Sequence, residues 1–148
     1  MKLYLVQHGI ASKEDIDPQK GLTPQGKEET KKLAQSLKRK GVTIDSIWHS
    51  NKLRAIQTAQ IIVETFNATE LIERDDLSPN DSVVGFESKI LESSKDIMIV
   101  GHLPFLAKLA CLLLSGNENF DSIIVKNSSA LCLENSDRWI IRWMVTPD

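Results

Sequence analysis

Strand-like apolar runs alternate with helical patterns along most of this 148-residue chain, and such alternation is typical of α/β folds with a parallel sheet. The clearest helix is expected over residues 24–40, where Thr23 is a suitable N-cap, Pro24 occupies the first turn and Gly41 follows the end. After Gly116 the strand-like runs follow one another closely, which predicts antiparallel strands added to a parallel core. The expected strands cover residues 2–6, 44–49, 70–73, 97–100, 123–125, 130–133 and 139–145, and the remaining helices cover residues 52–66, 82–94 and 103–114.

Length and composition predict a single domain over residues 1–148. The net charge of −2 gives no basic surface of the kind that binds nucleic acid or anionic membranes. No signal-peptide pattern follows Met1, and no apolar run approaches the ~20 residues that span a bilayer. Cys111 and Cys132 lie in apolar segments, as buried thiols do in a reducing compartment. We therefore expect a cytoplasmic monomer with neither nucleic-acid nor membrane partners.

Two of the three histidines come directly after expected strands. The first strand ends in Gln7-His8-Gly9, and the strand over 97–100 ends in Gly101-His102. Open α/β sheets carry their chemistry at these carboxyl ends. Arg54 lies between the two histidines in the sequence, at the start of an expected helix. A neutral imidazole can attack phosphorus, and an arginine fork with helix-start amides can hold the phosphoryl oxygens, so the pattern predicts phosphoryl transfer.

Four segments in the same order resemble the histidine phosphatase superfamily, which is phosphoglycerate mutase-like. They are His-Gly after the first strand, Leu-Thr-Pro-Gln-Gly at 22–26, S-x-x-L-R-A-x-Q-T at 50–58, and Val-Gly-His-Leu-Pro at 100–104. The short chain and the Gly-His-Leu-Pro segment are similar to the SixA-type phosphohistidine phosphatases. The resemblance implies a three-layer α/β/α sandwich with a mostly parallel central sheet and antiparallel C-terminal strands.

The resemblance also implies roles for individual residues. His8 would be the nucleophile that becomes phosphorylated, Arg54 would bind phosphoryl oxygens, and His102 would be the second catalytic histidine. No metal or cofactor is implied. The substrate would be a phosphohistidine-bearing protein of the phosphorelay or phosphocarrier type. The expected phosphate-binding residues are Gln7, Gly9, Arg54 and the backbone amide of Leu103.

Gln7 departs from the pattern, because the family motif reads Arg-His-Gly. Glutamine still donates hydrogen bonds, but it lacks the charge and the fork of arginine. Loss of one preorganised donor typically costs about 10²- to 10³-fold in rate. One alternative is therefore a weakly active phosphate-binding module.

A carboxylic acid that would protonate a departing alkoxide is also hard to find. Asp76 is the nearest candidate, after the third strand, although an ordinary loop carboxylate is its simpler interpretation. A protonated phosphoimidazole leaves as neutral imidazole and needs no such acid, which favours a P–N substrate. The other enzymatic alternative is a small-molecule phosphomonoesterase.

Three further features have structural interpretations. His49 has no carboxylate or cysteine spacing around it that would make a zinc site, so we expect a structural histidine. Ser50 is expected to cap the helix that follows it, with any role in the pocket secondary. The long irregular segment 9–22 follows His8 and is expected to cover the site.

Overall fold

A six-stranded mixed sheet forms the middle of the molecule in the computed structural model, which describes residues 1–67, 69–119 and 122–147. The strand order is β3-β2-β4-β1-β5-β6. The first four of these strands are parallel, and β5 and β6 add antiparallel pairs at one side. The strands are β1 (Lys2–Gln7), β2 (Ser46–Ser50), β3 (Glu70–Arg74), β4 (Ile97–Gly101), β5 (Ala130–Asn135) and β6 (Trp139–Val145).

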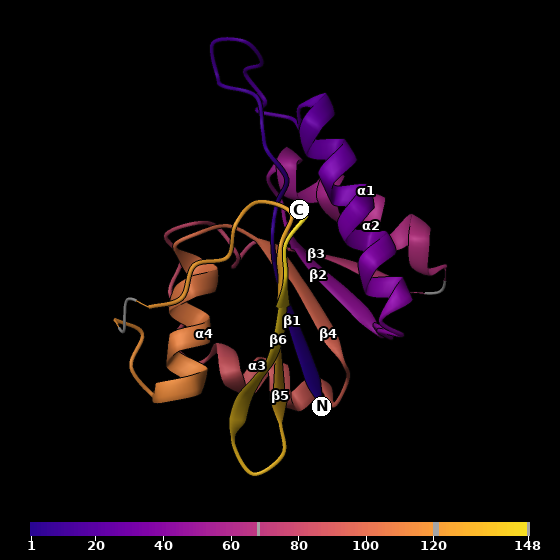
Figure 1. The fold of residues 1–148 in the computed structure, drawn as a ribbon. Helices are drawn as coiled ribbons and strands as arrows, with labels where there is room; N and C mark the ends of the chain where they lie inside the picture. Colours follow the sequence, from indigo (N-terminus) through magenta and orange to yellow (C-terminus); the bar gives the residue numbers. More distant parts are fainter. Residues whose placement is uncertain (68, 120–121, 148) are drawn as a thin grey trace.

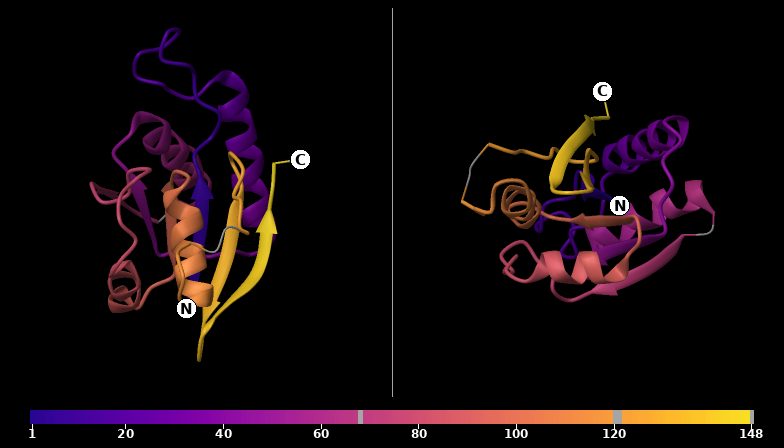
Figure 2. Two further views of the ribbon diagram at one scale, coloured as in Figure 1. Left: turned by 90° about the vertical axis from the view of Figure 1, so that its left-hand side faces the viewer. Right: turned by 90° about the horizontal axis from the view of Figure 1, so that it is seen from below.

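Helices cover both faces of the sheet and give the three layers that the sequence predicts (Figures 1 and 2). Helices α1 (Pro24–Arg39) and α2 (Leu53–Phe66) pack on one face, and α3 (Phe86–Ser93) and α4 (Phe105–Ser115) pack on the other. Each face has its own apolar cluster, because alternate strand residues point to opposite sides. Leu3 and Leu5 belong to one cluster, and Tyr4 and Val6 belong to the other.

The local signals at the start of α1 act as the sequence predicts. The side chain of Thr23 accepts a hydrogen bond from the Gly26 amide at 3.0 Å, and Pro24 occupies the first turn. Gly26 also lies where α1 crosses the chain leaving β1, and a side chain at this position would collide with the Ile10 carbonyl. The close approach of α1 to the segment after His8 therefore depends on this glycine.

The strand expected over residues 123–125 is wrong. The described residues of this segment form no ladder, although Val125 is fully buried and Ile124 is 70% exposed. Both edges of β1 are already paired, with β4 and with β5, so the segment meets that strand only through an isolated bridge from Asn127 to Gln7. Strand propensity alone therefore does not bring this segment into the sheet, and its residues cross beside the end of β1 without ladder pairing.

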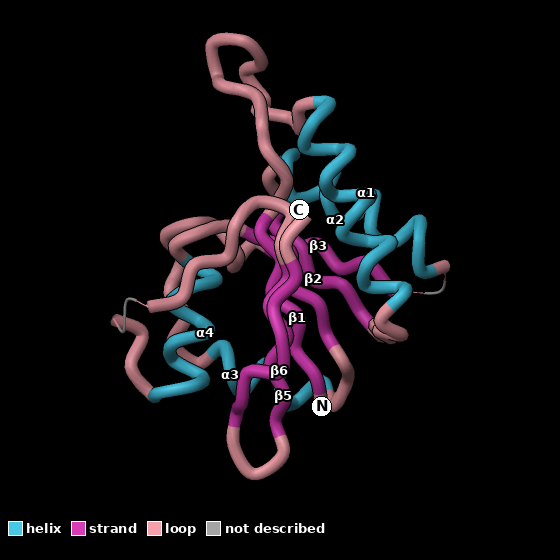
Figure 3. Tube along the Cα trace, in the orientation of Figure 1, coloured by secondary structure: helices cyan, strands magenta, loops and turns pink. Residues whose placement is uncertain are grey.

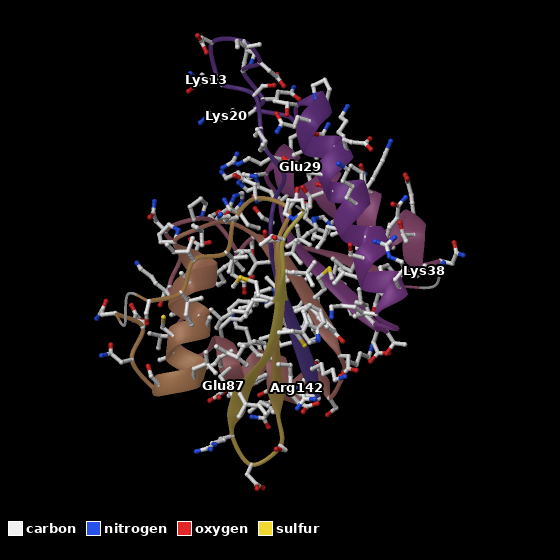
Figure 4. All side chains as sticks on the ribbon, viewed as in Figure 1. Lys13, Lys20, Glu29, Lys38, Glu87 and Arg142 are labelled. Atoms are coloured by element: carbon white, nitrogen blue, oxygen red, sulfur yellow. The ribbon has the colours of Figure 1, made fainter. Side chains whose placement is uncertain are left out.

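The segment over 9–22 forms a loop that stands out beyond the carboxyl ends of the strands (Figure 3). Its stem is closed by a bridge between Ala11 and Leu22 and by Asp17, whose carboxylate accepts the Gly21 amide at 2.8 Å. The tip carries Lys13 and Lys20 away from the sheet (Figure 4). The loop therefore borders the strand ends, and its tip does not lie across them.

Candidate active site

The sheet register brings the two expected catalytic histidines together. Gln7 pairs with Gly101 at the ends of β1 and β4, so His8 and His102 leave adjacent strands at the same level. The His8 amide donates to the Gly101 carbonyl at 3.0 Å. The two imidazole ring centres lie 5.0 Å apart. A separation of 94 residues in sequence thus becomes direct proximity at the carboxyl edge of the sheet.

The imidazole of His8 is oriented by the backbone beside it. Its Nδ1 lies 2.7 Å from the Gly9 carbonyl oxygen. A carbonyl can only accept, so Nδ1 carries the proton and Nε2 keeps its lone pair in the neutral ring. The backbone around His8 is held from the C-terminal part of the chain, because Asn127 Nδ2 donates to the His8 carbonyl at 2.9 Å. His8 therefore presents a fixed, unprotonated nitrogen.

His102 is almost completely buried and contacts a residue that the sequence did not assign to the site. Its Nε2 lies 2.8 Å from Ser50 Oγ. Its Nδ1 is buried and has no hydrogen-bond partner among the described residues. A buried polar nitrogen without a partner is costly, and such groups are common where a ligand completes the bonding.

Both imidazoles are held in their neutral forms. Burial lowers the pKa of His8 most, and the nearby Arg54 charge lowers it further, against the opposing effect of the Gly9 hydrogen bond. Burial lowers the pKa of His102 to about 3, with added repulsion from His8, Arg54 and Lys52. At neutral pH the site therefore contains two neutral imidazoles beside a cationic guanidinium.

Arg54 lies in the first turn of α2, close enough to act on the pKa of both histidines. None of the ion pairs within the described ranges involves Arg54, so its charge is available to an anion. Thr58, one turn later, donates to the Arg54 carbonyl at 2.8 Å and accepts the Gly9 amide at 3.0 Å. This hydroxyl joins the first turn of α2 to the end of β1.

Gly9 is better placed to orient His8 than to bind phosphate. Its amide already donates to Thr58, and its carbonyl accepts from the His8 ring. The phosphate-binding role expected for Gly9 therefore does not fit its hydrogen bonds. The Leu103 amide, by contrast, makes no backbone hydrogen bond in the described part of the chain, in keeping with a donor role.

Gln7 and Leu103 line an open groove of about 810 Å³ beside the histidines. Its lining residues come from α1 and from the crossing segment that holds Ile124 and Lys126. Gln7 makes no side-chain hydrogen bond that ties it elsewhere among the described residues. Its amide group is thus free to reach a ligand at the edge of the site.

Asp76 is not suited to the proton-donor role for which it was the nearest candidate, and its simpler interpretation as an ordinary carboxylate fits better. Arg74 binds both of its carboxylate oxygens, at 2.8 and 2.7 Å, and Lys89 binds one at 2.9 Å. The hydrogen bonds from Arg74, together with Lys89, lower the pKa of Asp76 to about 2. A carboxyl group in this state carries no proton at neutral pH, and the arrangement matches an ordinary structural ion pair.

Replacement of Asp76 by Asn should affect stability and leave catalysis largely unchanged. The folded-state pKa lies below the ordinary 3.8, so the stabilisation is present above about pH 4 and disappears as the pH falls toward 2. The side chain is 28% exposed, and we expect the variant to lose about 1–2 kcal/mol of unfolding free energy at pH 7. Urea unfolding at pH 7 and pH 3, with turnover measured at pH 7, checks this. A large loss of turnover in a folded variant would restore Asp76 as a proton donor.

His49 behaves as the structural histidine that the sequence predicts. It is buried, and its Nδ1 donates to the Ser50 carbonyl at 3.0 Å. No group of three His, Cys, Asp or Glu side chains in residues 1–67, 69–119 and 122–147 is arranged to hold a metal. Nor is any helix in these ranges long and apolar enough to cross a membrane.

Comparison with known proteins agrees with this geometry. The family model of the histidine phosphatase superfamily (branch 1) matches residues 3–81. Phosphohistidine phosphatase SixA of Escherichia coli K12 is 26% identical over 154 residues, covering 99% of this chain and 94% of SixA.

Solved structures share the whole fold. Protein histidine phosphatase SixA complexed with tungstate has a TM-score of 0.86 at 22% identity, with 99% of this chain and 97% of that chain covered. A putative alpha-ribazole-5'-P phosphatase from Escherichia coli has a TM-score of 0.82 at 18% identity, with 99% and 98% covered. The family model covers more than half of the chain: the chain belongs to the histidine phosphatase superfamily and is a phosphatase, a hydrolase, of that family.

Proposed function

We propose that the protein removes phosphoryl groups from histidine residues of a signalling or carrier protein, through an intermediate phosphorylated on His8. The observation that carries this proposal is the fixed Nε2 lone pair of His8, whose ring centre lies 5.0 Å from that of a neutral His102, beside Arg54, which forms no ion pair with any described residue. The similarity to SixA supports the substrate class.

In the first step, His8 Nε2 attacks phosphorus in line with the P–N bond of the substrate. The new bond is between His8 Nε2 and phosphorus, and the bond that breaks joins phosphorus to the substrate imidazole. Arg54 and the Nδ1–H of His102 hold the equatorial oxygens as their charge develops. The side-chain amide of Gln7 and the backbone amide of Leu103, which line the groove, donate further hydrogen bonds to the phosphoryl oxygens.

In the second step, water attacks the phosphoryl group on His8. The P–Nε2 bond breaks, and inorganic phosphate leaves with the oxygen of that water. The Gly9 carbonyl holds the Nδ1 proton throughout, which returns His8 to its starting tautomer. No metal ion is required by either step.

The state of Asp76 supports a P–N substrate. An alcohol leaving group needs a proton from an acid, and the only candidate that the sequence offered is ionised by Arg74 and Lys89. A phosphoimidazole protonated from solvent departs as neutral imidazole without an enzyme acid. The open groove beside Gln7 and Leu103 also suits a substrate carried on a folded partner, because it leaves room next to the histidines.

Turnover of a phosphohistidine-containing carrier protein should exceed that of a sugar phosphate or an alcohol monophosphate. We expect kcat/KM to differ by about 10²-fold or more, the scale of one missing general acid. The measurement is release of inorganic phosphate from each substrate under the same conditions. A clear preference for the sugar phosphate would favour the small-molecule phosphomonoesterase.

A further inference from the structure

We propose that Ser50 is a positioning residue that fixes the tautomer of His102, so that Nδ1 carries the proton that is donated to the phosphoryl group. The inference rests on the proposed function for its catalytic consequence. The tautomer itself is a property of the free protein and can be tested separately.

The hydrogen bonds of Ser50 give its hydroxyl a direction. Ser50 Oγ accepts the backbone N–H of Lys52 at 3.2 Å and lies 2.8 Å from His102 Nε2. Among the described residues Ser50 Oγ has no other partner. With the Lys52 amide supplying one proton, the serine O–H has one acceptor left, which is His102 Nε2. The lone pair therefore lies on Nε2 and the ring proton on Nδ1.

The opposite tautomer would leave two polar groups poorly bonded. If Nε2 carried the proton, the Ser50 O–H would have no acceptor, although Ser50 is fully buried. Nδ1, which is also buried and unpartnered, would then face an incoming phosphoryl group with a lone pair. Lone pairs of the ring and of the anion would repel each other. Each unsatisfied buried group costs about 1–3 kcal/mol, so the Nδ1–H tautomer is strongly favoured.

Burial first, and then the surrounding groups, keep the His102 ring neutral by lowering its pKa, so the tautomer of the neutral ring matters. The charged or titratable groups that face His102 are His8 from the end of β1, Arg54 from α2 and Lys52 from the turn before α2. All of these disfavour a second proton on the ring. A neutral imidazole has one proton to donate, so its location decides whether His102 is a donor or an acceptor toward phosphate.

The pairing of β2 with β4 places Ser50 next to His102. Ser50 ends β2, which pairs in parallel with β4, and His49 pairs with Val100 in the register. Ser50 is therefore level with the end of β4, one residue before His102. The serine and the second histidine of the family pattern are 52 residues apart and form one unit.

Nitrogen-15 NMR of the histidine rings in the wild-type protein at pH 7 tests the tautomer without any activity. We expect the coupling pattern of a neutral ring protonated on Nδ1, assigned to His102 by its loss in His102→Gln. A ring protonated on Nε2 would overturn the inference, whether or not the protein dephosphorylates any substrate.

Steady-state kinetics of the Ser50→Ala variant test the catalytic consequence, which is that the Nδ1–H of His102 is available to the phosphoryl group. We expect kcat to fall by about 10- to 100-fold with KM changed far less, because such supporting partners act on the reacting group. The expected NMR change is a mixture of both His102 tautomers. Ser50→Thr keeps the hydroxyl and should restore most of kcat.

Ser46→Ala is a matched control at the other end of the same strand. Ser46 is also buried, and its Oγ has no partner among the described residues, so its removal should leave kcat and the tautomer unchanged. A folded Ser50→Ala variant with wild-type kcat and an unchanged tautomer would contradict the inference. If Ser50→Ala does not fold, the wild-type spectrum alone decides the outcome. If the wild type turns over no phosphohistidine substrate, the proposed function fails and the spectrum still decides the tautomer.

Discussion

His8→Ala should abolish turnover and the phosphorylated intermediate together. The fixed imidazole nitrogen of His8, with its free lone pair next to Arg54, is then lost, while the sheet register and His102 remain. We expect kcat to fall by about 10⁴-fold or more, the scale on which loss of a nucleophile acts in hydrolases. The measurement is phosphate release from a phosphohistidine carrier protein, with radiolabel on the enzyme trapped by alkaline quenching.

A second histidine at a strand end provides the control for this experiment. His49 is the next-to-last residue of β2, but its Nδ1 donates to the Ser50 carbonyl, and among the described residues its ring makes no hydrogen bond or ring contact with His8 or His102. A folded His49→Gln variant should therefore still acquire label on His8. Label found on another residue, or label retained by His8→Ala, would refute the nucleophile assignment.

Gln7→Arg should raise turnover by up to about 10²- to 10³-fold, because it adds the charged fork that the family motif carries at this position. Gln7 ends β1, and its side chain faces the groove next to the site without a hydrogen-bond partner in the described part of the chain. The gain should appear mainly in kcat, since the fork stabilises charge that develops on the phosphoryl oxygens. Steady-state kinetics with the carrier protein measures it.

Gln25→Arg is the matched control for added charge. Gln25 lines the same groove from α1 but lies outside the strand ends, so its replacement should leave kcat unchanged. Phosphate binding, measured by calorimetry, should be detectable in all three proteins. If Gln7→Arg stays at background turnover while binding phosphate normally, the protein is a phosphate-binding module.

Regular elements were predictable because their signals are local. The N-cap Thr23 and the first-turn Pro24 of α1 can be recognised within four consecutive residues. The strands β1 and β4 are marked by short, uninterrupted runs of apolar residues. The strand over 123–125 failed because pairing is not local. Its residues have strand propensity, but β1 has no free edge to pair with it.

In the candidate site, too, some residues could be recognised from the sequence around them and others only from tertiary contacts. His8, Arg54 and His102 were recognisable from their places after strands and at a helix start. Ser50 was predicted mainly to cap α2, which is wrong because Lys52 is the N-cap of that helix, and nothing in its neighbours indicates a contact 52 residues away. Asn127, which holds the His8 carbonyl, had no sequence signal at all, since it lies in an irregular crossing segment.

The sequence by itself determined the layered α/β class, the parallel core with antiparallel C-terminal strands, and the residue types that handle a phosphoryl group. Only the tertiary structure decided how these residues are hydrogen-bonded: the Gly9 carbonyl binds Nδ1 of His8, and Ser50 Oγ lies next to Nε2 of His102. It also decided that Asp76 is ionised by Arg74. Propensity and motif spacing act along the chain, whereas proton positions and pKa values depend on burial and on groups brought together by strand register.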